Sequence, residues 1–338
     1  MHSTVEPLMR VEGVERIFGG RRKLFGGHRA GVHAVQDVSL DIMPGETLGI
    51  VGESGCGKST LARMLVGLDQ PTGGSIRFKG RDIADTLRND FNGLARNIQY
   101  VFQDPVSSLN PRKTIRSILE APLKHLLGLG RKERAERLGT LMDAVNLRPE
   151  FLERYPHEFS GGQAQRIGIA RALAADPELI VLDEPVSALD VSVQAQVINL
   201  LADLKARFGL TYVFISHDLS VVESVSDRVA VMYFGRLAEL GPARALFADP
   251  RHRYTRLLLD SVPAPGKPIV ACEGSEGDLP DPYDPPAGCA FAPRCPAADD
   301  LCRSQRPALD AGAVDGAHLA ACFHPPLLTG ETAGDGQL

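Results

Sequence analysis

The sequence lacks the features of a secreted or membrane-spanning protein. None of its apolar runs is long enough to cross a bilayer, and residues 1 to 30 contain no apolar h-region of a signal peptide. We therefore expect a cytosolic chain, held at a membrane only by another subunit. It also lacks an excess of positive charge, with a formal net charge of -5 and a pI near 6.0. Because binding to a phosphate backbone normally needs a basic face, we expect no nucleic-acid partner.

Cysteine is scarce over most of the chain. One cysteine, Cys56, stands alone, and the other five lie in the last fifth, at positions 272, 289, 295, 302 and 322. In a reducing cytosol this clustering argues against a disulfide framework and favours metal or cluster ligation. With 338 residues, the chain is long enough for two or three domains and a substantial core.

A glycine-rich loop after an apolar run is the strongest motif. The run predicts a buried strand ending at Val51, and the pattern Gly-x4-Gly-Lys-Ser follows it directly. The glycines let successive N–H groups point at one anion, and a helix beginning near Lys58 adds its positive end. Lys58 would then reach the β and γ phosphates, and Ser59 would hold magnesium. The predicted nucleotide loop consists of Gly52, Glu53, Ser54, Gly55, Cys56, Gly57, Lys58, Ser59 and Thr60.

The segments around this loop predict a layered domain. Alternating patterns predict strands at residues 8–18, 33–42 and 75–79, which would form an antiparallel β-layer beside the phosphate-binding strand. A buried strand that starts at Ile98 is expected to end at Gln103. From about residue 115 to 147 the leucine spacing predicts helices of a small helical subdomain.

A second candidate phosphate site begins at Ser160. This residue is well placed as the N-cap of a helix through Leu173, and Gly161, Gly162 and Gln163 follow it. Two glycines in a first helical turn reduce helix stability, so we expect the backbone there to approach something closely. A helix N-terminus with bare N–H groups and a hydroxyl suits a phosphate.

Two carboxylates follow an apolar strand at residues 179–182. Carboxyl ends of parallel strands line the crevice where open α/β sheets bind ligands. Asp183 is therefore predicted to hold magnesium, and Glu184 to orient or deprotonate an attacking water. A helix from Val191 to Phe208, a strand from Thr211 to Ile215 and then His217 follow, and His217 is expected to face the γ-phosphate.

In this order, the motifs resemble the ATP-binding cassette family, the nucleotide-binding subunits of ABC transporters, over roughly residues 8 to 248. The resemblance implies an α/β P-loop fold, with a RecA-like core, an antiparallel β-layer and a helical subdomain inserted at about 106–172. It also implies an ATPase that uses ATP and Mg²⁺.

The resemblance assigns roles to single residues. It implies that Glu184 is the general base or water-positioning residue and that His217 senses the γ-phosphate. Gln103 would link magnesium, held by Ser59 and Asp183, to the helical subdomain. The adenine-stacking aromatic maps to Phe18, with Phe25 as the competitor.

The family resemblance also implies a partner cassette. The signature Phe-Ser-Gly-Gly-Gln at residues 159–163 has Phe where Leu is commonest, and in this family it closes over ATP held by another subunit. The sequence contains one cassette, so the second must come from another chain.

Narrower motifs resemble the ATP-binding subunits of bacterial oligopeptide and dipeptide importers. They include residues 107–112, 155–158 and 184–194, and His252-Arg253-Tyr254-Thr255, where the family usually has His-Pro-Tyr-Thr. The sequence from Ser160 to Arg171 resembles that of the second of the two unequal ATPases of these importers, which implies a heterodimer. Two membrane permease subunits, an indirectly acting solute-binding protein and a place on the cytoplasmic face of the inner membrane are implied with it.

The segment from 249 to 328 resembles the carboxy-terminal extension of the same importers. Its four spaced cysteines, Cys289, Cys295, Cys302 and Cys322, could hold a [4Fe-4S] cluster or zinc, or could be reduced structural thiols. Cys272 is assigned no role, and residues 329–338 are expected to be a disordered tail. The helix N-terminus near Cys56 suggests a stabilised thiolate that oxidation could modify, although a small residue that simply fits is the plainer interpretation.

Other functions stay open at this point. The cargo could be a dipeptide, a longer peptide, nickel or another small solute. A ribosome-associated or DNA-repair cassette ATPase is a different class, but such proteins usually have tandem cassettes or long coiled coils. The tail could also be an independent iron–sulfur redox module.

Overall fold

A computed structural model describes residues 6–19, 31–261, 279–309 and 317–326. The chain divides into two units, which we describe separately. The first comprises Met1–Val14, Ser39–Gly49 and Ser59–Ser216, and the second comprises Glu15–Val38, Ile50–Lys58 and His217–Leu338. Phe25, Cys272 and the expected tail at 329–338 lie outside the described residues. In the described part of the chain, no helix has the length and hydropathy needed to cross a membrane.

Three strands contribute residues to both units. These are β1 (Met9–Gly19), β2 (Gly31–Ile42) and β3 (Thr47–Val51). A four-stranded sheet has the order β2-β1-β4-β5, with β4 at Gly73–Phe78 and β5 at Arg81–Asp82. Strands β4 and β5 are antiparallel, with Arg77 opposite Asp82. The β-layer expected within the first hundred residues is confirmed.

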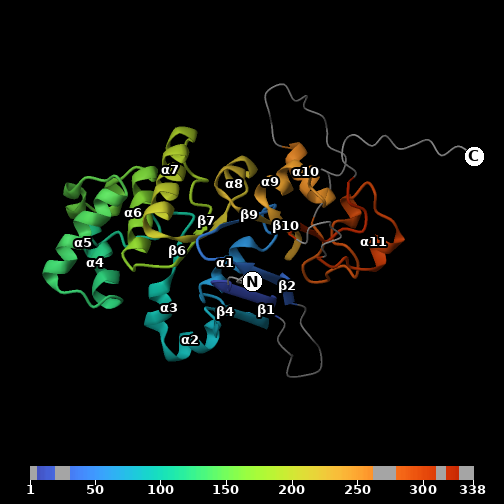
Figure 1. Ribbon diagram of the computed structural model, residues 1–338, viewed down its shortest axis with the longest axis horizontal. Coiled ribbons are helices and arrows are strands. Elements are labelled where there is room, and N and C mark those ends of the chain that lie inside the picture. Colours follow the sequence, from blue (N-terminus) through green and yellow to red (C-terminus); the bar gives the residue numbers. More distant parts are fainter. Residues whose placement is uncertain (1–5, 20–30, 262–278, 310–316, 327–338) are drawn as a thin grey trace, which may run out of the picture. The chain divides into compact units, whose positions relative to one another are not determined.

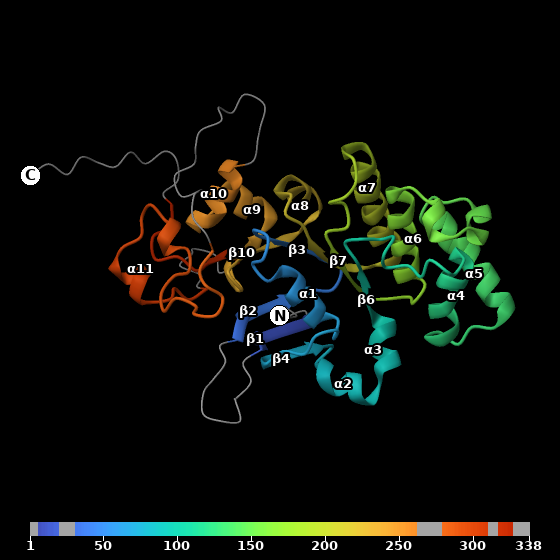
Figure 2. The same cartoon turned by 180° about the vertical axis from the view of Figure 1, so that it is seen from behind.

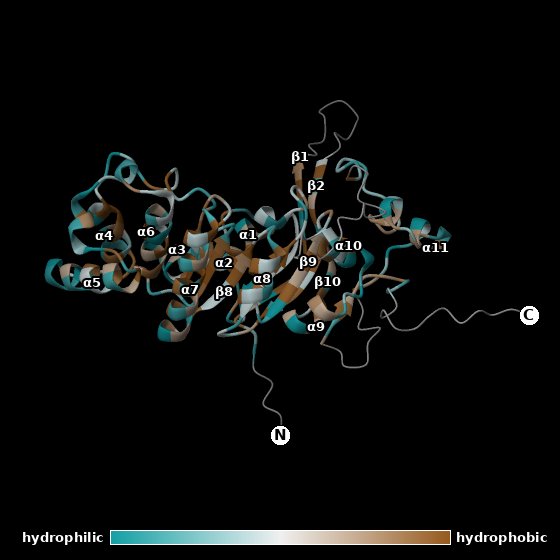
Figure 3. Cartoon of the chain, turned by 90° about the horizontal axis from the view of Figure 1, so that it is seen from above, coloured by the Kyte–Doolittle hydropathy of each residue, from teal (hydrophilic) through white to brown (hydrophobic). Residues whose placement is uncertain are grey.

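The core of the first unit is a parallel set of strands. Their order is β8-β7-β6, with β6 at Ile98–Val101, β7 at Leu179–Asp183 and β8 at Thr211–Ile215. Leu179 pairs with both Ile98 and Thr211, which fixes the register across the three strands. All residues of β7 and β8 are buried, as strands covered on both faces require. Figure 3 shows the hydrophobic residues of β8 beside α7 (Val191–Phe208).

The helices of the first unit follow the expected order. Helices α4 (Ile115–His125) and α5 (Arg131–Ala144) pack together and against α6 (Gly161–Leu173), which Figure 1 shows as one helical group. The helices expected between about residues 115 and 147 are therefore α4 and α5. Gly128, with φ +67°, and the extended Gly130 separate them, because a left-handed residue cannot continue a helix.

Shorter helices complete the first unit. Helices α2 and α3 lie between β5 and β6, and Figure 2 shows α3 leading into β6. The bounds are α1 Lys58–Leu65, whose first residue belongs to the second unit, α2 Ile83–Asn89, α3 Phe91–Asn97, and the 3₁₀ helices η1 Pro149–Glu153 and η2 Pro156–Glu158.

The second unit contains an antiparallel set and the carboxy-terminal extension. Its strand order is β9-β10-β11, in which Glu239 of β10 lies opposite Ala320 of β11. Strand β11 of the extension thus pairs with β10, which lies much earlier in the chain. The bounds are α8 Leu219–Val225, β9 Arg228–Tyr233, β10 Arg236–Pro242, α9 Ala243–Ala248, α10 Arg253–Ser261, η3 Ala292–Arg294, α11 Asp300–Ser304 and β11 Leu319–Ala320.

Candidate functional site

Two glycines of the predicted nucleotide loop, Gly52 and Gly57, leave no space for a larger residue without rearrangement. Gly52 has φ +152°, and a Cβ there would lie 2.2 Å from the Met232 carbonyl oxygen. Gly57 has φ +104°, and its Cβ would lie 2.3 Å from the Ala34 carbonyl oxygen. The backbone at these two glycines therefore packs closely against Met232 and Ala34, which restricts the conformation of the loop between them.

Lys58 is folded over this loop. Its ammonium group donates to the carbonyl oxygens of Gly52 at 2.7 Å and Glu53 at 2.9 Å, and the residue is 6% exposed. These bonds hold the cation at the centre of the loop. A buried ammonium bonded to neutral carbonyl oxygens suits an incoming anion.

Ser59 and Asp183 meet in the first unit. The Ser59 hydroxyl donates to Asp183 Oδ1 at 3.1 Å, which brings together two of the predicted magnesium ligands. Tyr100 in β6, which the sequence reasoning missed, donates its hydroxyl to Asp183 Oδ2 at 2.6 Å. Burial and this bond raise the pKa of Tyr100, so the phenol stays a donor. Its position on a strand that pairs with β7 is the signal that could have identified it.

Gln103 and Glu184 form a second pair in the same unit. Gln103 Nε2 donates to Glu184 Oε2 at 2.9 Å. Strand β6 ends at Val101, two residues earlier than expected, so Gln103 lies in the following loop. Glu184 has φ +48°, and its amide donates to the Ile215 carbonyl at 2.9 Å. This left-handed turn directs the chain away from the strand immediately after Asp183.

The predicted signature segment forms the start of α6. Ser160 is its N-cap: its hydroxyl accepts from Gln163 N at 3.4 Å, and Gln163 Oε1 accepts from Ser160 N at 3.1 Å. A Cβ on Gly162 would lie 2.3 Å from Val193 Cγ1, whereas one on Gly161 would meet only Leu189, at 3.4 Å. Packing against α7 therefore explains Gly162. The N-terminal end of α6, formed by Ser160, Gly161 and Gln163, is open to a ligand.

Two further predicted residues lie in the second unit. His217 is exposed in the turn after β8, next to Asp218, which caps α8. Phe18 in β1 is 38% exposed, and the Arg16 guanidinium lies 4.5 Å from its ring centre. An exposed aromatic ring suits stacking on a base. Of the remaining loop residues, Ser54 and Gly55 are exposed and Thr60 lies within α1.

The expectation of a stabilised Cys56 thiolate is wrong. Cys56 is 1% exposed, and burial raises the pKa of its thiol despite the nearby Lys58. A Cβ on Gly52 would lie 2.7 Å from Cys56 Sγ, so the sulfur fills a space between the loop and β9. The side chain is a small residue that fits the space.

The four cysteines of the extension are free thiols that lie near one another. Burial raises the pKa of Cys289, and Cys302, Cys322 and Cys295 each add to that rise. Within the described residues, the compact ligand group is Asp299, Cys302 and His324, whose ligand atoms lie within 4.8 Å of one another. Four sulfurs around one zinc ion would be at least as close, since Zn–S bonds are about 2.3 Å. The four thiols are not arranged for a single zinc ion.

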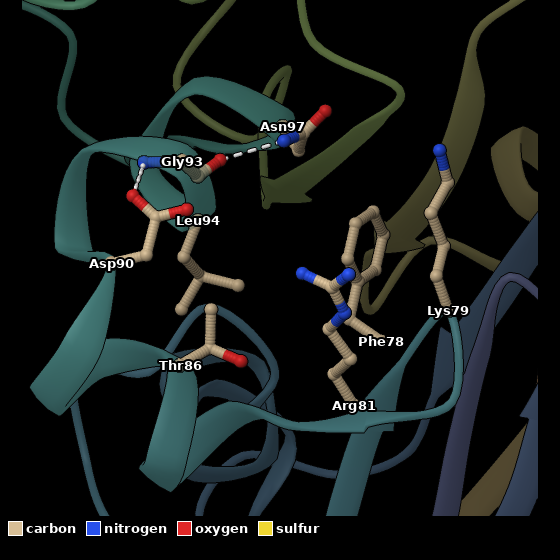
Figure 4. Close-up of a pocket in the computed structure, with 8 residues that line it drawn as sticks. All are labelled: Phe78, Lys79, Arg81, Thr86, Asp90, Gly93, Leu94 and Asn97. Atoms are coloured by element: carbon tan, nitrogen blue, oxygen red, sulfur yellow. Dashed lines mark hydrogen bonds between the residues drawn. The ribbon is translucent and has the colours of Figure 1, made fainter.

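A cavity of about 310 Å³ lies elsewhere in the first unit. Figure 4 shows it between β4–β5 and α2–α3, and it is lined by Phe78, Lys79, Arg81, Thr86, Asp90, Gly93, Leu94 and Asn97. Lys79 pairs with Glu178 at 2.6 Å, and Asp90 accepts from Gly93 N at 2.9 Å. None of the lining residues belongs to the predicted site.

Comparisons with known proteins identify the family of this chain. Residues 35–187 match the ABC transporter family, and residues 238–302 match the oligopeptide/dipeptide transporter C-terminal region. The chain is 50% identical to the oligopeptide transport ATP-binding protein AppF of Bacillus subtilis over 94% of this chain and 97% of that protein. It is 49% identical to the dipeptide transport ATP-binding protein DppF of Haemophilus influenzae, over 94% of this chain and 97% of that protein.

A solved structure supports the same assignment. A dimeric ATP-binding cassette in a post-hydrolysis state, bound to ADP and Pi, covers 70% of this chain and 99% of its own, with a TM-score of 0.62 and 29% identity. The chain belongs to the ATP-binding protein family of oligopeptide and dipeptide ABC transporters.

Proposed function

We propose that this chain is the ATPase subunit that drives import of peptides through a membrane permease. The observation that supports this proposal most is the loop between Gly52 and Gly57, which leads through Lys58 directly into Ser59, itself bonded to Asp183. A tightly packed loop, a buried cation and, at the next residue, a hydroxyl bonded to a carboxylate suit Mg-ATP.

Each residue has a distinct task in this proposal. The loop N–H groups and Lys58 bind the phosphates. Ser59, Asp183 and Gln103 would hold Mg²⁺, which when bound neutralises charge on the phosphate oxygens. Glu184 accepts the proton of the attacking water or orients that water, and His217 donates to the γ-phosphate. Phe18 stacks on the adenine. Positioning and charge stabilisation account for hydrolysis without a covalent intermediate.

We also propose that the ATP site is completed by another chain. Ser160, Gly161 and Gln163 form an uncovered helix N-terminus, which suits the γ-phosphate of ATP on a partner cassette. The partner is a second, unequal ATPase subunit, so the working pair is a heterodimer. Binding of ATP closes the pair, and hydrolysis reopens it.

The membrane partners and the cargo are inferred from what the relatives are named for. AppF and DppF are named for oligopeptide and dipeptide transport. By this relation the present chain binds two permease subunits at the cytoplasmic face of the inner membrane, and a solute-binding protein delivers the peptide. The cassette corresponds to residues 1–248, with the helical subdomain at about 106–172, and the extension to residues 249–328.

The four extension thiols are proposed to hold a [4Fe-4S] cluster. Support comes from their free state and mutual proximity, together with an arrangement that does not suit one zinc ion. After anaerobic purification an absorbance band near roughly 400 nm is expected. Cys289→Ser should abolish the band and Cys272→Ser should leave it. A band-free, iron-free protein would remove the cluster.

Reconstitution tests the transport function. The chain, expressed with its neighbouring genes, should co-purify from membranes with two multi-span subunits and a second cassette subunit. ATPase activity of that complex should rise when a peptide-loaded binding protein is added. Recovery on ribosomes, or stimulation by nickel and not by peptides, would overturn the proposal.

A further inference from the structure

The extension makes an ion pair with the nucleotide loop inside the second unit. Arg294 Nη1 and Nη2 each donate to one carboxylate oxygen of Glu53, both at 2.9 Å. The Arg294 side chain is 6% exposed and that of Glu53 is 31% exposed. A bidentate, largely buried pair of this kind fixes both partners in orientation as well as in distance.

Every polar group of Glu53 is engaged by a neighbour. Its amide donates to the Tyr254 hydroxyl at 2.8 Å, its carbonyl accepts from Lys58 Nζ at 2.9 Å, and its carboxylate holds Arg294. Two of these three partners lie outside the loop, one in α10 and one in η3. The second residue of the nucleotide loop is thus positioned by the extension.

Aromatic rings support this contact. The ring of Tyr233 lies 4.5 Å from that of Tyr254 and 5.4 Å from that of Phe291. The Arg294 guanidinium lies 5.7 Å from the Phe291 ring centre and 5.9 Å from that of Tyr233. Such rings exclude water from one side of the ion pair and restrict the rotamers of Arg294.

The turn that presents Arg294 belongs to the cysteine-bearing fold. Ala292 N donates to the Cys289 carbonyl at 3.0 Å, and Cys295 N donates to the Ala292 carbonyl at 3.3 Å. Cys289 N in turn donates to the Cys302 carbonyl at 2.7 Å. Arg294 is therefore placed by the same backbone that places three of the cysteines.

We propose that Arg294 is a positioning residue for ATP binding, which acts through Glu53 and makes the affinity of the nucleotide loop depend on the extension. This inference rests on the proposed ATP site at Gly52–Lys58. Two physical effects favour it. The pair holds the loop backbone in the conformation that directs its N–H groups, and it neutralises a carboxylate that would otherwise repel the phosphates.

Substitution of Arg294 in the full chain tests the proposal. Arg294→Gln should raise the Kd for Mg-ATP, measured by calorimetry, on the order of tenfold, because a small misplacement of binding groups is costly. Arg294→Lys keeps the positive charge but cannot make the bidentate contact. Its Kd should therefore lie between those of the wild type and Arg294→Gln. The matched control is Arg303→Gln in α11, an exposed arginine paired with Asp300, which should bind ATP like the wild type.

A double-mutant cycle shows whether Arg294 acts through Glu53. Glu53→Gln alone should raise the Kd less than Arg294→Gln does, because it loses the pair but also removes the repelling carboxylate. Adding Arg294→Gln to it should change the Kd little further, because the interaction is already lost. Steady-state ATPase assays should show a raised KM with kcat at saturating ATP near wild type. A role in folding alone would instead lower kcat through the active fraction and leave KM unchanged.

The outcomes separate this inference from the function on which it rests. A wild-type Kd in both Arg294 variants, or in Arg294→Lys alone if Arg294→Gln does not fold, overturns the positioning role. Fully additive effects of the two substitutions overturn the route through Glu53. Wild-type ATP binding by Lys58→Ala would instead refute the proposed ATP site itself.

Discussion

The Tyr100 hydroxyl donates a 2.6 Å hydrogen bond to Asp183, on the carboxylate oxygen that Ser59 does not contact. Asp183 Oδ1 thus contacts Ser59 of the nucleotide loop, and Asp183 Oδ2 is bonded to Tyr100 of the neighbouring strand β6. Partners of this kind orient a metal-binding carboxylate.

Removal of the Tyr100 hydroxyl should weaken the binding of Mg²⁺ that supports ATPase activity. We expect Tyr100→Phe to raise the Mg²⁺ concentration needed for half-maximal ATPase activity by about tenfold, as for other groups that support metal ligands. The matched control is Tyr212→Phe, which removes a buried hydroxyl bonded to the Leu201 carbonyl. Equal Mg²⁺ dependence in the two variants would contradict the orienting role of Tyr100.

Glu184→Gln should separate ATP binding from hydrolysis. The amide cannot accept a proton, so turnover by the assembled complex should fall by at least about a hundredfold, while the Kd for Mg-ATP stays near wild type. Phosphate release and calorimetry measure the two quantities. Glu178→Gln, just before β7, removes a carboxylate that pairs with Lys79 and should retain activity. Substantial hydrolysis by Glu184→Gln would exclude Glu184 as the base.

Alanine at the two signature glycines should have unequal effects on stability. Gly162→Ala places a methyl group 2.3 Å from Val193 Cγ1, so we expect a loss of about 1–3 kcal/mol in the free energy of unfolding, measured in urea. Gly161→Ala meets only ordinary contact with Leu189 and should fold normally. Val193→Ala should recover much of the loss in Gly162→Ala. If both glycine variants are equally stable, packing does not explain Gly162.

The buried His252 should make stability fall in acid. Its Nδ1 accepts from Tyr254 N at 3.0 Å, and burial lowers the pKa of His252 from 6.5 to about 4. Between these pH values the unfolded chain binds a proton that the folded chain does not. The contribution of His252 is therefore complete above pH 6.5 and declines as the pH falls towards 4, by up to about 1.4 kcal/mol per pH unit.

The variant His252→Asn should show a shallower dependence of unfolding free energy on pH over this range. Asparagine keeps an acceptor for Tyr254 N but does not titrate. Glu239 accepts from His252 N and contacts His318, and it remains in both proteins. His125→Asn, at an exposed position of α4, is the control. A variant that retains the wild-type slope would show that His252 does not cause the acid sensitivity.

Local signals predicted much of the fold. The helix Val191–Phe208 begins at an aspartate cap and ends at Gly209 with φ +65°, as its sequence indicates. The N-cap at Ser160 and the strand Thr211–Ile215 are also as predicted. Caps, left-handed glycines and apolar runs act within a few residues. The leucine spacing at 115–147 predicted helices but not where the first ends and the second begins, because that break is set by the backbone at Gly128 and Gly130.

The sequence by itself determined the order of the motifs, from the nucleotide loop to His217, and with it the family. Only the tertiary structure decided which side chains meet: Arg294 with Glu53, 241 residues apart, Tyr254 with the Glu53 amide, and Tyr100 with Asp183. It also decided that Cys56 is buried and protonated and that Gly162 yields space to Val193. The physical reason is that motifs are set by local backbone geometry, whereas pairing, burial and shifted pKa values arise when distant segments pack against each other.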